Sequence, residues 1–279
     1  MKIFRIESAR KGSRRWTLQR MGLALLVAIA LPLLAMSSAF AGPANAAKPT
    51  LVLVHGAFAG SSSWNGVVEK LIKKGFPVVA AANPLRSVKG DAAYVSSLVK
   101  SIPGPVVLVG HSYGGSVITD AAAGNSNVIA LVYVAGFAPD VGETPGSLNG
   151  KFPGSTLGPT LAPPVILADG SKELYILQDK FHDQFAADVD AATAATMAAT
   201  QRPIIEAAFN DAAQVATWKT IPSWFVYGTL DKNIPAALHE FMAKRAGSKK
   251  TIGVKGASHV VMVSHPDVVA SLIEAAASK

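Results

Sequence analysis

The sequence predicts an α/β fold with a mainly parallel sheet of about six strands. The first indication is a set of short apolar runs, typical of strands buried on both faces, at residues 51–54, 78–82, 106–109, 128–134, 224–227 and 251–254. The second is that helical stretches separate these runs, at residues 64–74, 91–101, 113–123, 235–246 and 266–277. Strands that alternate with helices are joined by crossover connections, which give a parallel sheet with helices on both faces.

Two prolines mark where the last two helices begin. Pro235 and Pro266 each open a helical stretch, and the first turn of a helix tolerates proline because its N–H groups have no partner within the helix. One interval departs from the alternation, because residues 142–220 contain no clear strand and are rich first in Gly and Pro, then in Ala. We expect this interval to be a cap inserted over one end of the sheet, with a helix at residues 185–200.

Composition limits the class of protein. Of the 279 residues 50% are apolar and 16% are charged, which suits one well-buried domain or two small ones and excludes a disordered chain. The absence of Cys excludes a disulfide scaffold. Residues 1–41 contain seven of the 26 basic residues and one of the 18 acidic ones, so the rest of the chain has 19 basic and 17 acidic residues. The net charge of +8 therefore gives no reason to expect a nucleic-acid partner.

The first 41 residues have the pattern of an export signal. A basic region precedes an apolar run at residues 21–36, and small residues follow it, so we expect cleavage after Ala41, with Ala46 as a second site. The 16-residue run is short for a membrane span, which needs about 20 residues, so we expect no stable anchor after cleavage. Arg14 and Arg15 are typical of a twin-arginine signal, although general secretion stays possible. We expect the mature domain, residues 42–279, to be periplasmic or extracellular.

A G-x-S-x-G motif at residues 110–114 predicts a nucleophile. It follows one of the apolar runs and opens a helical stretch, which is the strand–turn–helix setting of a nucleophile elbow centred on Ser112. Gly110 and Gly114 suit the tight backbone, where a Cβ would clash, and Gly115 would let the helix approach the sheet. An ordinary glycine-rich turn is the alternative interpretation.

A serine hydroxyl needs a base, and the base needs a carboxylate that orients it. His259 follows the last apolar run and is the best candidate base, and Asp231 follows the run at residues 224–227. The order Ser112, Asp231, His259 is the one expected for this architecture. Asp140 is the competing acid, although it more simply begins the cap. We expect His182 and His239, in polar helical settings, to lie at the surface.

Donors for a developing oxyanion are expected after the first apolar run. The backbone N–H groups of Ala57 and Tyr113 form the predicted pair. Phe58 is expected in the pocket wall, and His55 is expected to shape the pocket floor. Because the sequence has no phosphate-binding glycine motif and no metal-ligand motif, we expect no nucleotide, cofactor or metal.

Together these residues resemble the α/β-hydrolase family across nearly the whole mature chain. The likeness is greatest to a subgroup with plant methyl-ester hydrolases, hydroxynitrile lyases and bacterial hydrolases, on residues 55–57, 64, 110–115 and 139–140. The resemblance implies a triad of Ser112, Asp231 and His259, with an oxyanion hole at Ala57 and Tyr113. It also implies about six parallel strands, although the usual antiparallel strands at the N-terminus are absent from the pattern.

Two positions depart from the lyases of that subgroup. The lyases have Thr after the first His and Lys after the catalytic His, whereas this chain has Gly56 and Val260. The departure counts against cyanohydrin cleavage. Ser112 likewise excludes a dehalogenase, which needs an Asp nucleophile.

The sequence therefore predicts a secreted serine hydrolase that cleaves carboxylic esters through an acyl-enzyme. We expect cap residues such as Phe181, Phe185 and Met197 to set substrate size, and the partner to be a small uncharged ester. Lactone, amide or peroxyacid chemistry on the same triad is an alternative, as is a ligand-binding member of the fold without turnover. The oligomeric state is not predicted.

Overall fold

The computed structural model describes residues 48–278, which include every residue that we assign to the site. The expected signal peptide and both cleavage positions lie outside the described residues. Among residues 48–278, no helix is long and apolar enough to cross a membrane.

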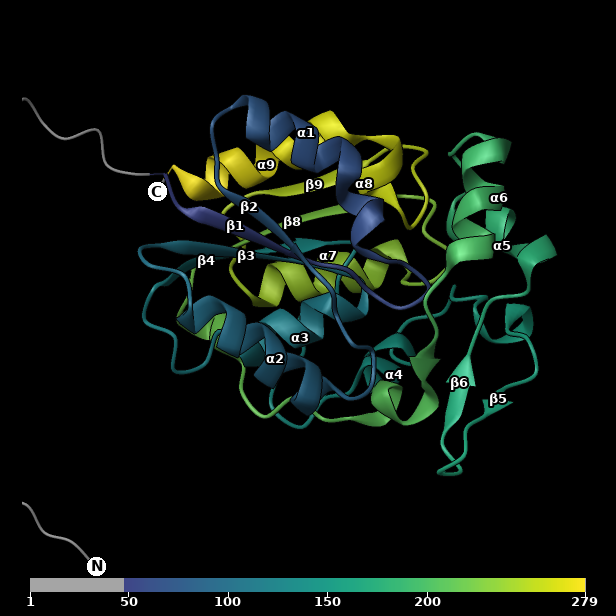
Figure 1. Ribbon diagram of the computed structural model, residues 1–279. Helices are drawn as coiled ribbons and strands as arrows, with labels where there is room; N and C mark the ends of the chain where they lie inside the picture. Colours follow the sequence, from purple (N-terminus) through teal and green to yellow (C-terminus); the bar gives the residue numbers. More distant parts are fainter. Residues whose placement is uncertain (1–47, 279) are drawn as a thin grey trace, which may run out of the picture. The chain divides into compact units, whose positions relative to one another are not determined.

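A six-stranded sheet forms the centre of the domain, and every neighbouring pair of strands is parallel (Figure 1). Its spatial order is β2-β1-β3-β4-β8-β9. The strands are β1 (Thr50–Val54), β2 (Val78–Ala81), β3 (Val106–His111), β4 (Val128–Val134), β8 (Ser223–Gly228) and β9 (Thr251–Val254). The α/β fold and its six strands are thus confirmed, because continuous apolar runs are what strands covered on both faces require.

Helices cover both faces of this sheet. Figure 1 shows α1 (Asn65–Lys73) and α9 (Pro266–Ala277) over one face, and α2 (Val88–Lys100) and α3 (Tyr113–Ala121) over the other. Helix α7 (Ala236–Arg245) packs against β8, and a short α8 (Val261–Ser264) precedes α9. Pro266 is the first residue of α9, as expected, whereas Pro235 lies one residue before α7 and caps it.

The cap segment, residues 142–220, lies between β4 and β8 and extends beyond the carboxyl ends of the central strands (Figure 1). It contains α4 (Pro145–Asn149), α5 (Gln178–Phe185), α6 (Ala191–Thr200) and an antiparallel sheet of β5 (Val165–Ile166), β6 (Lys172–Leu174) and β7 (Ile204–Ile205). Short 3-10 turns complete the domain at Ser61–Trp64, Gly158–Thr160, Glu206–Asn210 and Thr217–Lys219.

Two expectations for the cap were wrong. The segment does contain strands, but each has only two or three residues, too few for an alternating or apolar pattern to show. The helix expected at residues 185–200 is shorter, because α6 covers only Ala191–Thr200 and Phe185 is the last residue of the preceding helix α5. The chain breaks after Phe185, and Asp190 then caps α6 by accepting a hydrogen bond from the Thr193 N–H at 2.9 Å.

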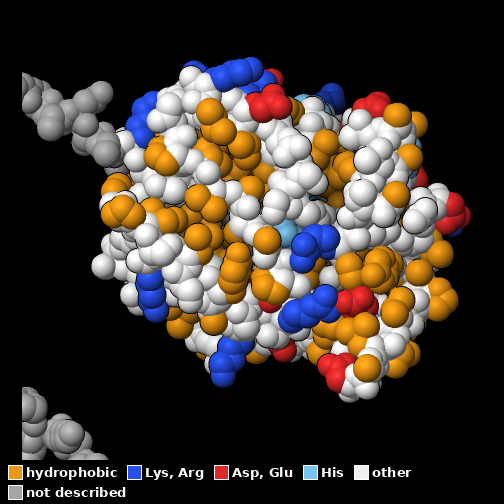
Figure 2. Space-filling view, in the orientation of Figure 1, with side chains coloured by type: hydrophobic (Ala, Val, Ile, Leu, Met, Phe, Trp, Pro, Cys, Tyr) orange, Lys and Arg blue, Asp and Glu red, His pale blue; other side chains and the backbone are white. Residues whose placement is uncertain are grey.

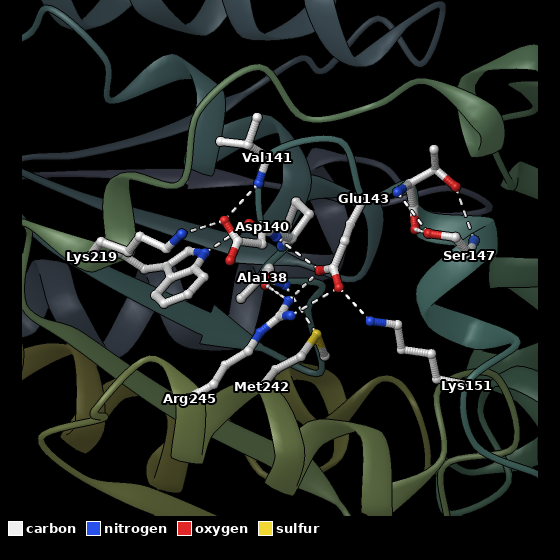
Figure 3. Close-up of polar contacts among 12 residues, drawn as sticks. Ala138, Asp140, Val141, Glu143, Ser147, Lys151, Lys219, Met242 and Arg245 are labelled. Atoms are coloured by element: carbon white, nitrogen blue, oxygen red, sulfur yellow. Dashed lines mark hydrogen bonds and ion pairs between the residues drawn. The ribbon is translucent and has the colours of Figure 1, made fainter.

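A polar network fastens the start of the cap to the central domain (Figure 3). Arg245 of α7 binds both carboxylate oxygens of Glu143, at 3.0 and 2.6 Å, and Lys151 binds the same carboxylate at 2.5 Å. Asp140 pairs with Lys219 at 2.5 Å. Burial acting alone would raise the pKa of Glu143, but these cations and the Asp140 N–H outweigh it and lower the pKa to about 2.

Candidate active site

Ser112 occupies a strained turn between β3 and α3. Its backbone has a positive φ of 54° with ψ of −125°, a conformation that a non-glycine residue holds only when its surroundings fix it. Hydrogen bonds to Val134 and from Gly115 and Phe137 hold both backbone groups of Ser112, at 2.9 to 3.2 Å. This is the geometry of the expected nucleophile elbow, which presents the side chain at the end of the strand.

Glycines allow the turn to pack closely. A Cβ on Gly110 would lie 2.5 Å from the Gly114 carbonyl oxygen, and one on Gly114 would lie 2.5 Å from that of Val54. At Gly115 it would meet the Phe137 carbonyl oxygen at 2.3 Å. Because such approaches are far shorter than real Cβ contacts, each position excludes larger residues, as the sequence predicted.

Gly56, in the loop after β1, lies directly against Ser112. A Cβ at this position would be 2.6 Å from the Ser112 Cβ and 2.8 Å from the His111 carbonyl oxygen. The threonine that the hydroxynitrile lyases carry here would therefore not fit this backbone. In this chain, the position of Ser112 therefore requires glycine at residue 56.

His259 and Asp231 meet although 27 residues separate them in the chain. Asp231 lies in the loop after β8 and His259 in the loop after β9, and His259 Nδ1 is 2.7 Å from Asp231 Oδ2. His259 and Ser112 line the same cavity. Asp140, the competing acid, instead pairs with Lys219 and does not line this cavity.

The surroundings keep Asp231 ionised. Its side chain has no exposed surface, and burial acting alone would raise its pKa. The pKa is nevertheless below its ordinary value, because the interaction with the charge of His259 and the hydrogen bonds from His239 and His259 outweigh burial. Backbone N–H groups of Asn233 and Ile234 also bind Oδ1, at 2.8 and 3.0 Å.

Two backbone N–H groups beside Ser112 are free to donate. Those of Ala57 and Tyr113 make no hydrogen bond to any residue in the described range. The N–H of Phe58 is occupied, because it donates to the Arg202 carbonyl at 3.0 Å. The Tyr113 hydroxyl donates to the buried Asp91 at 3.0 Å, which anchors the first turn of α3.

The cavity above Ser112 has a volume of about 330 Å³ and an apolar wall. Phe58 and Phe185 line it, as expected, and no Lys, Arg, Asp or Glu does. Phe181 lies behind Phe185, with ring centroids 4.9 Å apart, and Met197 lines a neighbouring hollow of about 270 Å³. His55 is absent from the cavity lining. It is buried with Nδ1 2.9 Å from the Gly56 carbonyl oxygen, and burial lowers its pKa to about 4.

The expectation that His239 lies at the surface was wrong. Its side chain is 1% exposed, and its Nε2 lies 3.2 Å from Asp231 Oδ2. The signal that reveals it is helical periodicity, because His239 shares the buried stripe of α7 with Leu238, Met242 and Ala243. Polar neighbours mask this stripe in the sequence.

The cap holds the two loops that carry Asp231 and His259. Gln184 Nε2 donates to Asn233 Oδ1 at 3.1 Å, and Asn233 Nδ2 donates to the backbone carbonyl of Gln184 at 3.2 Å. Asp188 accepts hydrogen bonds from the N–H and hydroxyl of Ser258, the neighbour of His259. Pattern within one segment could not reveal these contacts, because they join segments far apart in the chain.

Comparison of the sequence with known proteins identifies the family of this chain. A sequence model described as the alpha/beta hydrolase family matches residues 51–272. The chain belongs to the alpha/beta hydrolase family. The hydrolase nvfD of Aspergillus novofumigatus is 26% identical over 252 residues, covering 83% of this chain and 98% of the relative.

Solved structures of this family share the fold at low identity. Polyneuridine aldehyde esterase superposes with a TM-score of 0.70 and 18% identity, over 82% of this chain and 99% of the esterase. A methylesterase from Arabidopsis superposes with a TM-score of 0.67 and 17% identity, over 82% of this chain and 99% of the methylesterase. The chain is thus a hydrolase with esterases among its structural neighbours. Residues 48–278 contain no group of three or more His, Cys, Asp or Glu that could hold a metal ion.

Proposed function

We propose that this chain is an exported serine hydrolase that cleaves carboxylic esters through an acyl-enzyme. The observation that carries the proposal is that Ser112 and His259 line one apolar cavity while His259 Nδ1 is 2.7 Å from a buried carboxylate. With Nδ1 committed to Asp231, Nε2 is the histidine atom left to take a proton.

The proposed reaction has two halves. Ser112 Oγ attacks the ester carbonyl carbon and gives its proton to His259, while the N–H groups of Ala57 and Tyr113 bind the oxyanion. The alcohol leaves with the proton from His259, and the acyl group stays on Ser112. Water then loses a proton to His259 as it attacks the acyl-enzyme, and collapse of the second oxyanion releases the acid and returns the proton to Ser112. Asp231 stabilises the charge on His259 in both halves.

The cavity favours uncharged substrates. Its wall includes Phe58, Phe137, Phe185 and Phe209 and has no charged group to pair with an ionic substrate. An ion placed there would lose its hydration without compensation. We therefore propose esters with an aromatic or medium-length alkyl group as substrates.

The test is hydrolysis of p-nitrophenyl esters, from acetyl to decanoyl, by the chain from Gly42 onward. We expect turnover with an optimum at one chain length, and loss of at least about 1,000-fold in kcat for Ser112→Ala, because the nucleophile is removed. The variant should keep the Tm of the parent. Unchanged turnover in Ser112→Ala would contradict the mechanism.

Two alternatives give different results in the same assay. Lactone, amide or peroxyacid chemistry would show a low rate on these esters with Ser112-dependent turnover of the alternative substrate. A ligand-binding protein would show no burst of p-nitrophenol equivalent to the acyl-enzyme. Ala57, Tyr113 and the three triad residues favour turnover, because binding alone requires none of these five positions together.

A further inference from the structure

Two histidines, rather than one, bind the carboxylate of Asp231. Its Oδ2 accepts from His259 Nδ1 at 2.7 Å and from His239 Nε2 at 3.2 Å. With the backbone N–H groups of Asn233 and Ile234 on Oδ1, four donors surround the carboxylate. That number equals the lone-pair sites of a carboxylate, and its side chain has no exposed surface. All four acceptor sites of the Asp231 carboxylate are therefore occupied, and the bond from His259 occupies one of them.

Packing fixes the ring of His239. The ring stacks on Tyr227 of β8, with centroids 5.0 Å apart and planes inclined by 16°. Burial lowers the pKa of His239, which favours the neutral form of the ring. A neutral imidazole has one N–H, and the carboxylate at 3.2 Å requires that it be on Nε2. His239 is thus a fixed neutral donor to the acid.

We propose that His239 is a positioning residue, whose Nε2–H fixes the Asp231 carboxylate and limits how strongly it draws a proton onto His259. The proposal rests on the function proposed above, in which His259 is the general base. His239 touches neither substrate nor reacting atoms, and it acts through Asp231 alone.

The physical reason is that two donors share one oxygen. A hydrogen bond from His239 stabilises the negative charge on Oδ2, so less of that charge is available to stabilise an imidazolium at His259. Without His239, the whole charge on Oδ2 would therefore be available to His259. The same bond restrains rotation of the carboxylate and so helps to fix the ring of His259.

Other titratable groups around the pair come from several elements. His111 of β3 lies 4.8 Å from His259 between ring centroids, and burial holds its pKa well below the ordinary value. Tyr227 of β8 stacks on His239 and donates its hydroxyl to Glu240 of α7. Asp188 of the cap binds Ser258. Since a change at residue 239 leaves these groups in place, a shift in pH dependence reports on the bond to Asp231.

The first experiment compares His239→Phe with His239→Gln. Phe keeps the flat ring over Tyr227 but has no donor, whereas the Gln amide can still donate to Asp231. We expect His239→Phe to lose roughly tenfold in kcat and to move the acidic limb of kcat/KM upward by about half to one pH unit. His239→Gln should keep kcat within about twofold of the parent and leave the acidic limb of kcat/KM in place. A purely structural role would lower the Tm without moving the acidic limb.

Equal pH profiles and kcat for His239→Phe and the parent would overturn the proposal, as would equal impairment of both variants. A measurement on the parent protein avoids dependence on variant folding. Nitrogen NMR of ¹⁵N-histidine-labelled protein should show His239 as the neutral Nε2–H tautomer at pH 7. An Nδ1–H tautomer or a protonated ring would overturn the proposal.

The NMR titration also separates this proposal from the esterase proposal. If His239→Phe raises the midpoint of the His259 titration but no ester is cleaved, the esterase proposal fails and the role of His239 stands. If Ser112-dependent ester cleavage occurs and the midpoint does not move, the role of His239 fails and the esterase proposal stands.

Discussion

Glycines set the geometry around Ser112, and the sequence revealed only some of them. The clash expected at Gly110 and Gly114 follows from a local motif and is confirmed. Gly56 belongs to the resemblance at residues 55–57, but nothing in its own segment shows that it packs against Ser112. Pairing of β1 with β3, which sets Val54 beside Gly110, brings the loop that starts at His55 against the elbow. A steric contact between the loops after β1 and β3 therefore cannot be predicted from the sequence of either loop alone.

This contact gives a prediction for Gly56→Ala. The added Cβ would lie 2.6 Å from the Ser112 Cβ, so the nucleophile must shift, and we expect kcat to fall roughly 100-fold, as for a displacement of about 1 Å. The matched control is Gly60→Ala in the same loop, where the Cβ would meet Arg202 at an ordinary 3.4 Å. Ester hydrolysis and Tm of both variants are the measurements. Full activity of Gly56→Ala would show that the loop yields instead.

At the scale of elements, two separate sets of polar contacts join the cap to the central domain. Figure 3 shows the first attachment, where Arg245 and Lys151 meet Glu143. The second is the segment from Gln184 to Asp188, which binds the loops that carry the proposed base and acid. We infer that a change in cap position is transmitted to the proposed acid and base as well as to the cavity wall.

Glu143 makes the first attachment dependent on pH. Its pKa is lowered from 4.5 to about 2, so its stabilisation is fully present above about pH 4.5 and is lost as the pH falls through about 2. We expect Glu143→Gln to lower the free energy of unfolding by about 2 kcal/mol at pH 7, with less than about half of that difference left at pH 3. Urea unfolding of the variant and the parent at both pH values measures this difference in free energy.

The control for this prediction is Glu206→Gln, which removes a half-exposed pair with Lys172 at 3.5 Å. Such surface pairs contribute about 0–1 kcal/mol, so this variant should match the parent at both pH values. A Glu143→Gln difference that does not depend on pH would mean that packing, rather than the charge of Glu143, stabilises the attachment.

For the whole molecule, the order of the sheet assembles the site. Because β1, β3, β8 and β9 run parallel, the loops after them open at one edge, and these loops carry Ala57, Ser112, Asp231 and His259. The surface view shows hydrophobic side chains gathered over β5 and β6 of the cap (Figure 2), where Val165 and Ile166 are 48% and 60% exposed. Part of the outer surface of the cap is therefore apolar, at β5.

Export is a prediction about the whole chain. Expression of residues 1–279 in a bacterial host should give an exported protein whose N-terminus is Gly42, or Ala47 if the second site is used. Intact mass and N-terminal sequencing measure this. Replacement of Arg14 and Arg15 by Lys should block export if the twin-arginine route is used and leave it unchanged for general secretion. An uncleaved chain in the membrane fraction would contradict the prediction.

Patterns along the chain were sufficient for the six strands, the five principal helices and the position of the serine at a strand–helix turn. These follow from apolar periodicity and glycine chemistry, which act between residues close in sequence. Folding in three dimensions was needed for the split of α5 from α6, the short strands of the cap, and the burial of His239 against Asp231. Those features depend on contacts between distant segments, and the hydrogen bond that a polar residue gains there is not encoded in its immediate neighbours.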